Sequence, residues 1–324
     1  MNGKQAKPSA VQTPVIVSAS RATDVPAFFS DWLLDRLREG QVRWTNPFNG
    51  VPLTVSFAKT RLLVFWTKNP APMEARLDEL DALGLGYYFH FTLNDYEAEG
   101  LEPRVPPLAA RVETFKRLSR RLDPAGRRVI WRFDPLMLSD TLTVPILLEK
   151  IARLGEALHP YTRKLVFSFA DIGRYARVKR NLSRFEESRT CREFTSAEME
   201  LFAAGLVGLN RNWGLSLATC GEEADFSRCG IERNRCVDDR LIAELYGSDQ
   251  TLMAAIGYPA VRPDELFPAA AVPPKRRPRK DPGQRAACGC VTSKDIGAYN
   301  TCPHRCLYCY ANTYTGREDG ESKR

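Results

Sequence analysis

Three cysteines near the end of the chain have a spacing that suits metal chemistry. Cys302, Cys306 and Cys309 follow the pattern CxxxCxxC within the segment TCPHRCLYCYAN. Three thiolates on so short a loop can reach three irons of one cubane and leave the fourth iron without a protein ligand. An iron with an open position can bind a small molecule and pass an electron to it. The spacing therefore predicts a [4Fe–4S] cluster with one open iron.

A zinc ion is the alternative for this loop. His304 lies between the first two cysteines and could complete such a site. However, zinc motifs usually pair CxxC units and use four ligands. The aromatic residue Tyr308, directly before the last cysteine, also fits a cluster loop better. With a cluster bound, we expect His304 to contact a sulfur rather than a metal.

Four further cysteines supply a second set of thiolates. They end the last predicted strand, follow it, or form a CxC pair before the loop: Cys220, Cys236, Cys288 and Cys290. Four thiolates can hold a closed iron–sulfur cluster or a zinc ion, and the sequence slightly favours the cluster. Buried free thiols are the third interpretation. Cys229 is a replacement ligand for this set, whereas Cys191 is interpreted as incidental.

The distribution of cysteines and charge bounds the class of protein. All nine cysteines follow residue 190, and the chain has neither an apolar leader nor eighteen consecutive apolar residues, so we expect a cytoplasmic protein without a membrane span. The formal charge is +8, and the segment 275–285 carries six basic residues and one acid, which leaves only +3 for the rest. This segment is interpreted as a solvated linker or as a phosphate-binding strap.

The cysteines are carried by alternating strands and helices. Short apolar runs predict six strands, and periodic segments between them predict helices over Ser30–Leu37, Pro72–Leu83, Leu108–Leu122 and Val144–Leu158, with a further helix capped by Thr195 and Glu198. The predicted strands are Val15–Val17, Leu62–Trp66, Tyr87–Phe91, Val129–Phe133, Leu165–Phe169 and Gly214–Leu217. Such alternation specifies a parallel α/β sheet with right-handed crossovers.

Polar residues follow each predicted strand. They include Ser18, Ser20, Asp24, Lys68, Asn94, Arg132, Asp134 and Cys220. Because the carboxyl ends of parallel strands share one edge, these side chains are expected to form a site there. His90 lies inside a strand, where it is either catalytic or simply hydrogen-bonded, and His159 at a helix end is interpreted as structural.

The cysteine loop resembles the signature of the radical S-adenosylmethionine superfamily, and most of all its spore photoproduct lyase branch. Further similar segments are Thr67-Lys68, Phe91-Thr92-Leu93-Asn94 and Arg132-Phe133-Asp134-Pro135. As a whole, the chain is similar to a bacterial family of uncharacterised proteins that begin with a segment like 18–24 and end with this loop. The resemblance implies reductive cleavage of S-adenosylmethionine to a 5′-deoxyadenosyl radical, with electrons from a protein such as flavodoxin or ferredoxin.

The order of the elements differs from that superfamily, whose members carry the loop after the first strand. Circular permutation is the simplest explanation. It implies a partial (β/α) TIM-like barrel over residues 14–324, in which Asp295–Tyr299 is the first strand and lies beside Val15–Val17. Residues 1–13 are then a disordered tail, and 221–293 form a cysteine-containing extension and basic linker.

The resemblance also implies roles for individual residues. Tyr308 is expected near the adenine, Ser18, Ser20 and Asp24 near the methionyl amine or ribose, and Lys68 at the methionyl carboxylate. Asn94 is expected to bind the cofactor, and Lys68, His90, Arg132 and Asp134 form the catalytic set.

Competing functions remain. The substrate of a radical enzyme could be damaged nucleic acid, a small metabolite or a peptide, with nucleic acid not favoured because no aromatic-interleaved basic patch is present. The rivals are a non-enzymatic iron–sulfur or zinc protein that binds nucleic acid, and an electron-transfer protein.

Overall fold

The main feature of the fold is one large parallel sheet. The computed structural model describes residues 10–184, 190–258 and 280–313. Eight strands are hydrogen-bonded in the order β10-β9-β8-β7-β6-β5-β2-β11, and every neighbouring pair is parallel. Their bounds are β2 Ile16–Ala19, β5 Leu62–Thr67, β6 Gly86–Thr92, β7 Val129–Leu136, β8 Lys164–Phe169, β9 Ser216–Thr219, β10 Glu232–Arg233 and β11 Lys294–Asp295.

All six strands predicted from apolar runs are confirmed, with ends that differ by at most three residues. These runs are continuous rather than alternating because both faces of the sheet are buried. In β5, for example, Leu63 and Phe65 face one apolar core, whereas Leu62 and Val64 face a second.

The C-terminal strand lies where the permutation requires it. β11 pairs in parallel with β2, with Lys294 opposite Val17 and Asp295 opposite Ser18. It comprises two residues instead of the predicted Asp295–Tyr299, because the chain turns away at Gly297. A β-carbon at Gly297 would lie 1.8 Å from Ser20 Oγ, so only glycine permits this close approach. The described strands form an open order from β10 to β11, and a closed barrel is not seen.

Helices cover the larger core face of the sheet. The predicted helices correspond to α2 (Ser30–Arg38), α5 (Leu108–Leu122), α6 (Val144–Leu158) and α8 (Ser196–Asn210), and Thr195 and Glu198 form the predicted capping box of α8. The predicted helix Pro72–Leu83 is two helices, α3 (Ala71–Glu74) and α4 (Leu77–Ala82), interrupted at Ala75 and Arg76.

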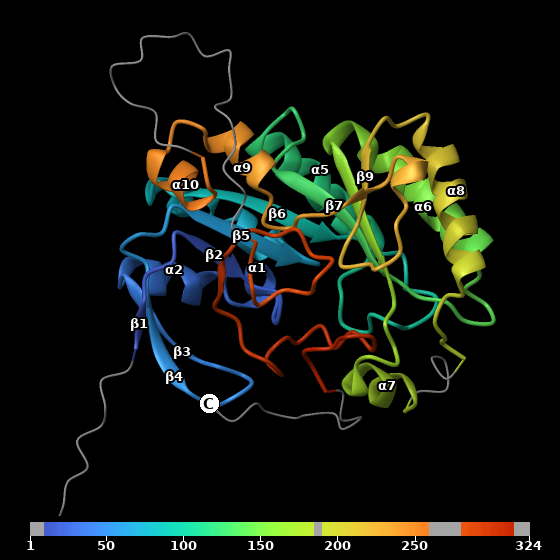
Figure 1. Ribbon diagram of the computed structural model, residues 1–324, viewed down its shortest axis with the longest axis horizontal. Coiled ribbons are helices and arrows are strands. Elements are labelled where there is room, and N and C mark those ends of the chain that lie inside the picture. The colour runs from blue at the N-terminus through green and yellow to red at the C-terminus, as the bar shows by residue number, and fades with distance from the viewer. Residues whose placement is uncertain (1–9, 185–189, 259–279, 314–324) are drawn as a thin grey trace, which may run out of the picture.

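The second core lies on the opposite face of the sheet. Ile242 of α9 (Asp239–Tyr246) and Leu252 of α10 (Gln250–Ala255) pack there against Leu62, Val64 and Tyr88. Figure 1 shows α9 and α10 on the other side of the sheet from α1 (Val25–Phe28) and α2, and the red C-terminal segment running beside β2. The same core includes Cys236 and Cys290. Segments near the N-terminus and near the C-terminus of the sequence thus pack on the same face of the sheet.

Sequence analysis did not predict a second, smaller sheet. β1 (Val11–Gln12), β4 (Pro52–Ser56) and β3 (Gln41–Thr45) form a three-stranded sheet in which β3 and β4 are antiparallel. The expected tail over residues 1–13 is therefore wrong at its inner end, and residues 1–9 lie outside the described part. Sequence analysis also missed α7 (Ala176–Leu182) and the helices α1, α9 and α10. Across the described ranges, no helix has the length and apolar character needed to span a membrane.

Candidate metal and cofactor site

The three spaced cysteines lie on residues 299–312, here named the cysteine loop. It follows β11 and packs on the loop after β6, where the backbone N–H of Leu307 donates to the carbonyl of Leu101 at 3.0 Å. The N–H of Asn300 donates to the carbonyl of Ala311 at 3.1 Å and closes the loop on itself. The thiols are thereby held at the carboxyl edge of the sheet.

All three thiols of the cysteine loop are free, and they lie within electrostatic reach of one another. Burial raises the pKa of Cys302 to about 12, and the negative charge of Asp24 adds to that shift. Burial also raises the pKa of Cys306 well above its usual value, and Lys68 opposes that shift. A bound metal would supply the positive charge that offsets these shifts. Three free thiols spaced CxxxCxxC on one loop are a donor set that fits an iron–sulfur cluster.

His304 ties the cysteine loop to the loop after β2. Its Nε2 lies 3.0 Å from Asp24 Oδ2, and the same oxygen accepts the backbone N–H of Lys68 at 2.7 Å. Asp24 Oδ1 accepts the N–H of Ala27 and caps α1. Both carboxylate oxygens of Asp24 thus hold three segments together, which is a positioning role beside the cofactor role expected from sequence.

A buried polar network adjoins the cysteine loop. Lys68 Nζ lies 2.8 Å from both Glu102 Oε1 and Tyr308 Oη, and Asn94 Nδ2 donates to the same two atoms at 3.0 Å. Tyr308 also donates to Glu102, and Arg111 Nη1 lies 3.6 Å from the other oxygen of Glu102. The predicted residues Lys68, Asn94 and Tyr308 are therefore neighbours, joined by a carboxylate that sequence analysis did not name.

Glu102 is the residue that sequence analysis missed. Burial raises its pKa, but Lys68 and Arg111 lower it more, so the pKa of Glu102 lies below its ordinary value. For Lys68 the signs are opposite: burial lowers its pKa, and the negative charge of Glu102 raises it by more, so the pKa of Lys68 lies above its ordinary value. Two cations and one carboxylate give this network a net charge of +1. Glu102 comes ten residues after β6 ends, so a search directly after each strand could not find it.

The two serines expected near the cofactor both have hydrogen-bond partners within the protein. Ser18 Oγ lies 2.9 Å from Ser293 Oγ, and Ser20 Oγ accepts the N–H of Ala22 at 2.9 Å. Both serines are buried beside β11. Ser18 therefore contacts the segment before β11, whereas Ser20 closes a turn within its own loop.

The remaining members of the predicted catalytic set are not all together. Arg132 Nε donates to Asp134 Oδ2 at 3.0 Å, and Ser168 donates to the other oxygen of Asp134. Asn94 connects this pair to the Lys68 network, because its Oδ1 accepts the N–H of Asp134 at 2.9 Å. His90 is separate from both: its Nε2 lies 2.8 Å from the carbonyl of Cys236, and its ring stacks on Trp66. Burial and then Arg132 lower the pKa of His90 well below its usual value, which keeps the ring neutral.

The four remaining cysteines of the predicted second set are adjacent in space. Cys220 Sγ lies 3.5 Å from Cys236 Sγ, and Cys290 is hydrogen-bonded to both Cys236 and Cys288. Within the described ranges, no three His, Cys, Asp or Glu side chains are already arranged as metal ligands. Cys229 lies apart and exposed in a 3₁₀ helix, and Cys191 packs at the edge of the larger core. His159 begins a 3₁₀ turn after α6, as its structural interpretation suggested.

The described end of the basic segment is engaged within the protein. Arg285 Nη1 lies 2.9 Å from Asp171 Oδ2, and Lys280 Nζ donates to the carbonyl of Ala286 at 2.6 Å. Residues 275–279 lie outside the described part. Arg285 therefore has an intramolecular partner and is not a free phosphate contact.

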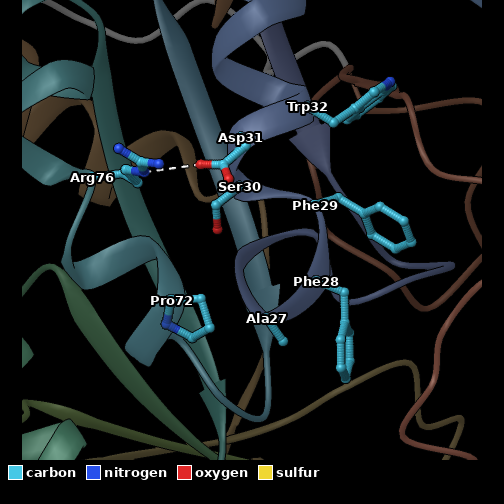
Figure 2. A pocket seen from close by; sticks show the side chains of 8 residues that line it. All are labelled: Ala27, Phe28, Phe29, Ser30, Asp31, Trp32, Pro72 and Arg76. Carbon is cyan, nitrogen blue, oxygen red and sulfur yellow. Dashed lines mark hydrogen bonds and ion pairs between the residues drawn. The ribbon is translucent and has the colours of Figure 1, made fainter.

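A shallow pocket lies beside α1 and α2, with a volume of ≈ 320 Å³. Figure 2 shows Phe28, Phe29 and Trp32 on one side and the ion pair of Arg76 with Asp31 on the other. Phe28 packs edge-on against His304, with ring centroids 4.6 Å apart. The pocket thus borders the cysteine loop, although none of its lining residues belongs to the polar network.

Fold and site define the class of protein: an α/β protein whose parallel sheet carries a cysteine loop and a buried charged network at its carboxyl edge. The chain belongs to the family described as domain of unknown function (DUF1848), whose model matches residues 16–311. No curated protein matches it. Among solved structures, a Bacteroides thetaiotaomicron protein provisionally described as an alpha-L-fucosidase shares 8% identity over 78% of this chain and 97% of its own, with a TM-score of 0.26. A likeness this slight bears on neither fold nor function.

Proposed function

We propose that the protein is a radical S-adenosylmethionine enzyme. In this proposal Cys302, Cys306 and Cys309 bind a [4Fe–4S] cluster. When bound, the cluster supplies one electron that cleaves S-adenosylmethionine to methionine and a 5′-deoxyadenosyl radical, which then removes a hydrogen atom from the substrate.

The observation that carries the proposal is the placement of the three free thiols. They lie on one short loop that follows β11 at the carboxyl edge of a parallel sheet, where active sites of such folds lie. A closed structural metal site would require a fourth ligand. His304, the nearest alternative, is already held between Asp24 and the carbonyl of Arg104.

The polar network supports binding of an amino acid moiety beside that loop. Its net charge of +1 from Lys68, Arg111 and Glu102 favours an added carboxylate. In the proposed complex Lys68 binds the methionyl carboxylate, because its ammonium is compact and adjoins Cys306. Asn94 and Tyr308 orient Lys68, and Asp24 fixes the loop through His304. Arg132 and Asp134 border the site on the far side of Asn94 and are proposed to contact substrate.

The permuted fold belongs to the same proposal. Insertion of β11 beside β2 supports a circularly permuted partial barrel over residues 14–324, in which β11 is the first strand. The described part of 221–293 supplies α9, α10 and three of the four cysteines of the second set between β9 and β11. An external reductant such as flavodoxin or ferredoxin is required. The substrate class stays open between small metabolite, peptide and damaged nucleic acid, and the intramolecular pairing of Arg285 weakens the last.

The test is formation of 5′-deoxyadenosine by anaerobically reconstituted, dithionite-reduced full-length protein incubated with S-adenosylmethionine. We expect product from the wild type and from C191S/C229S, which removes two cysteines outside both sets. The variant C302S/C306S/C309S should give none. Absence of product from wild type at full iron and sulfide loading would reject the enzyme and favour a structural or electron-transfer protein.

A further inference from the structure

We propose that Cys220, Cys236, Cys288 and Cys290, here named the four-cysteine group, bind a single zinc ion through four thiolates. The site is distinct from the cysteine loop and does not depend on the proposed radical chemistry. Its role is to fasten the chain before β11 to the sheet, and so to position the strand that carries the cysteine loop.

The four thiols form a continuous series of contacts. Cys220 Sγ lies 3.5 Å from Cys236 Sγ, Cys236 contacts Cys290, and Cys290 contacts Cys288. All four are free thiols. They arrive from three places: the end of β9, the segment after β10, and the segment before β11. Four thiols that meet from such distant positions match the ligand set of a closed structural zinc site.

Nitrogen donors surround these sulfurs. The backbone N–H of Cys236 and that of Val237 donate to Cys290 Sγ at 3.1 and 3.4 Å. Asn234 Nδ2 and Arg132 Nη1 each donate to Cys236 Sγ at 3.2 Å. Such N–H groups favour a thiolate over a thiol, since a neutral thiol accepts hydrogen bonds weakly. Sulfurs buried only as apolar core would not need four donors.

Two arginines supply positive charge to the group. Arg132 contacts Cys236 directly, and Arg21 interacts electrostatically with Cys290 and Cys236. Arg21 Nη2 is buried with no hydrogen-bond partner among the described residues, which is unusual for a guanidinium. Zinc with four thiolates carries a net negative charge, and these two cations offset part of it, since Arg132 is also paired with Asp134.

The spacing of the sulfurs favours one metal ion over a cluster. In tetrahedral coordination with Zn–S bonds of about 2.3 Å, ligand sulfurs lie about 3.8 Å apart. The 3.5 Å separation of Cys220 and Cys236 is close to that value. In a cubane each thiolate binds a different iron, so the four sulfurs diverge from a bulky core. The slight preference of the sequence for a cluster is thereby reversed. Cys220 and Cys288, at the two ends of the series, are partly exposed, and in the proposed site their side chains would rotate to complete the tetrahedron.

The position of the group explains what the metal would do. The N–H of Val291 donates to the carbonyl of Val237 at 3.1 Å, and Ser293 contacts Ser18 of β2. These two contacts are few for a segment that follows the undescribed residues 259–279. A metal bond to Cys288 and Cys290 would hold this segment against β9, and with it β11.

The first test measures zinc, iron and acid-labile sulfide per chain in full-length protein purified without added metal. Wild type, C191S/C229S and C302S/C306S/C309S should each retain one zinc per chain, and C236S/C290S none. Because C236S/C290S alters a core, the milder variant C220S/C288S changes only the partly exposed thiols and should also lose zinc. C220S/C288S leaves the cysteine-loop ligands and the pairing of β11 with β2 in place, so it should still bind iron in the reconstituted protein, and the two metal proposals fail independently.

The second test replaces zinc by Co²⁺ and records its absorption. A tetrathiolate site gives intense d–d bands and a thiolate-to-cobalt charge-transfer band in wild type but not in C220S/C288S. Zinc retained by both four-cysteine variants, iron with sulfide bound to this group, or no metal in wild type would each overturn the proposal. So would a disulfide between Cys220 and Cys236 found by thiol counting.

Discussion

The two cysteine regions differ in how their thiols are brought together and in how they are surrounded. The cysteine loop places its thiols within eight positions of one another, from Cys302 to Cys309, whereas the four-cysteine group spans Cys220 to Cys290. At the loop, the neighbouring charges belong to Lys68 and Glu102, which also contact each other. In the four-cysteine group, four side-chain and backbone N–H groups donate to Cys236 and Cys290, whereas at the loop Asn312 donates to Cys309 at the longer distance of 3.5 Å.

In the two proposals, this contrast separates a site that leaves room for a ligand from one that closes on its metal. Three ligands and an adjacent charged network suit binding of a further molecule, and four ligands with several N–H donors suit a permanent structural ion. Variants that affect one region without the other therefore test the distinction directly.

The largest effect is expected from Glu102→Gln. It removes the carboxylate between Lys68 and Arg111 and leaves two buried cations uncompensated, so the free energy of unfolding should fall by about 3–5 kcal/mol. Urea denaturation measures this change. Because Lys68 and Arg111 hold the pKa of Glu102 below its ordinary 4.5, the advantage of wild type is full at pH 7 and shrinks as the pH falls below 4.5.

The matched control is the exposed ion pair of Arg76 and Asp31, whose side chains are 43% and 73% exposed. Asp31→Asn should change the free energy of unfolding by less than about 1 kcal/mol. Equal losses of unfolding free energy in the two variants would mean that Glu102 contributes no more than a carboxylate in an exposed ion pair, and that it is not the centre of a buried network.

Lys68→Met is expected to weaken binding of S-adenosylmethionine to the cluster-loaded protein by about 10- to 100-fold. The loss corresponds to one hydrogen bond to a charged group, about 1.5–3 kcal/mol. Equilibrium binding measures it, and the zinc content of the four-cysteine group should not change. Lys150→Met removes a lysine paired with Glu99 at 3.0 Å elsewhere in the fold, and should leave the affinity unaltered. Equal weakening by both variants would contradict a carboxylate-binding role for Lys68.

Sequence alone predicted the parts of this arrangement that depend on local patterns. The six strands were found because residues such as Leu62–Trp66 are apolar on both faces, and the cysteine loop because its spacing is local. Insertion of β11 beside β2 followed from the resemblance and is confirmed by their pairing. The short strands β1, β3 and β4 have half-exposed, mixed sequences that give no comparable signal.

Other features depend on tertiary contacts that no local pattern encodes. Glu102 lies in a loop without periodicity, and its importance comes from Lys68 and Arg111, which are 34 residues before it along the chain and nine after it. The histidine considered for catalysis, His90, shows the reverse: its strand position was right, but the carbonyl that it meets belongs to Cys236, which is 146 residues away.

Gly297→Ala tests whether β11 is fixed as closely to β2 as the comparison requires. The added β-carbon would lie 1.8 Å from Ser20 Oγ, so the variant should lose about 1–3 kcal/mol in the free energy of unfolding. Ser20→Gly in the same chain removes the clash and should restore part of that loss. Gly208→Ala in α8, where a β-carbon meets nothing within 4 Å, should be neutral or stabilising. No recovery in the double variant would mean that the contact with Ser20 is not the cause.

The smallest effect comes from a matched pair of asparagines, one in each cysteine region. Asn234 Nδ2 donates to Cys236 Sγ at 3.2 Å, and Asn312 Nδ2 donates to Cys309 Sγ at 3.5 Å. An N–H bond to a ligand sulfur stabilises its negative charge, so it strengthens metal binding in a closed site and raises the reduction potential of a cluster.

Asn234→Ala should therefore lower zinc affinity by about tenfold, measured by competition with a chelator, and leave the cluster potential unchanged. Asn312→Ala should shift the potential of the reconstituted cluster downward, measured by a redox titration followed by electron paramagnetic resonance, and leave zinc affinity unchanged. If each variant changed only the property of its own region, the two regions would hold different metals for different purposes. If each variant altered both properties, the regions would be coupled through β2 and β11, and the separation of a ligand-binding site from a structural one would have to be abandoned.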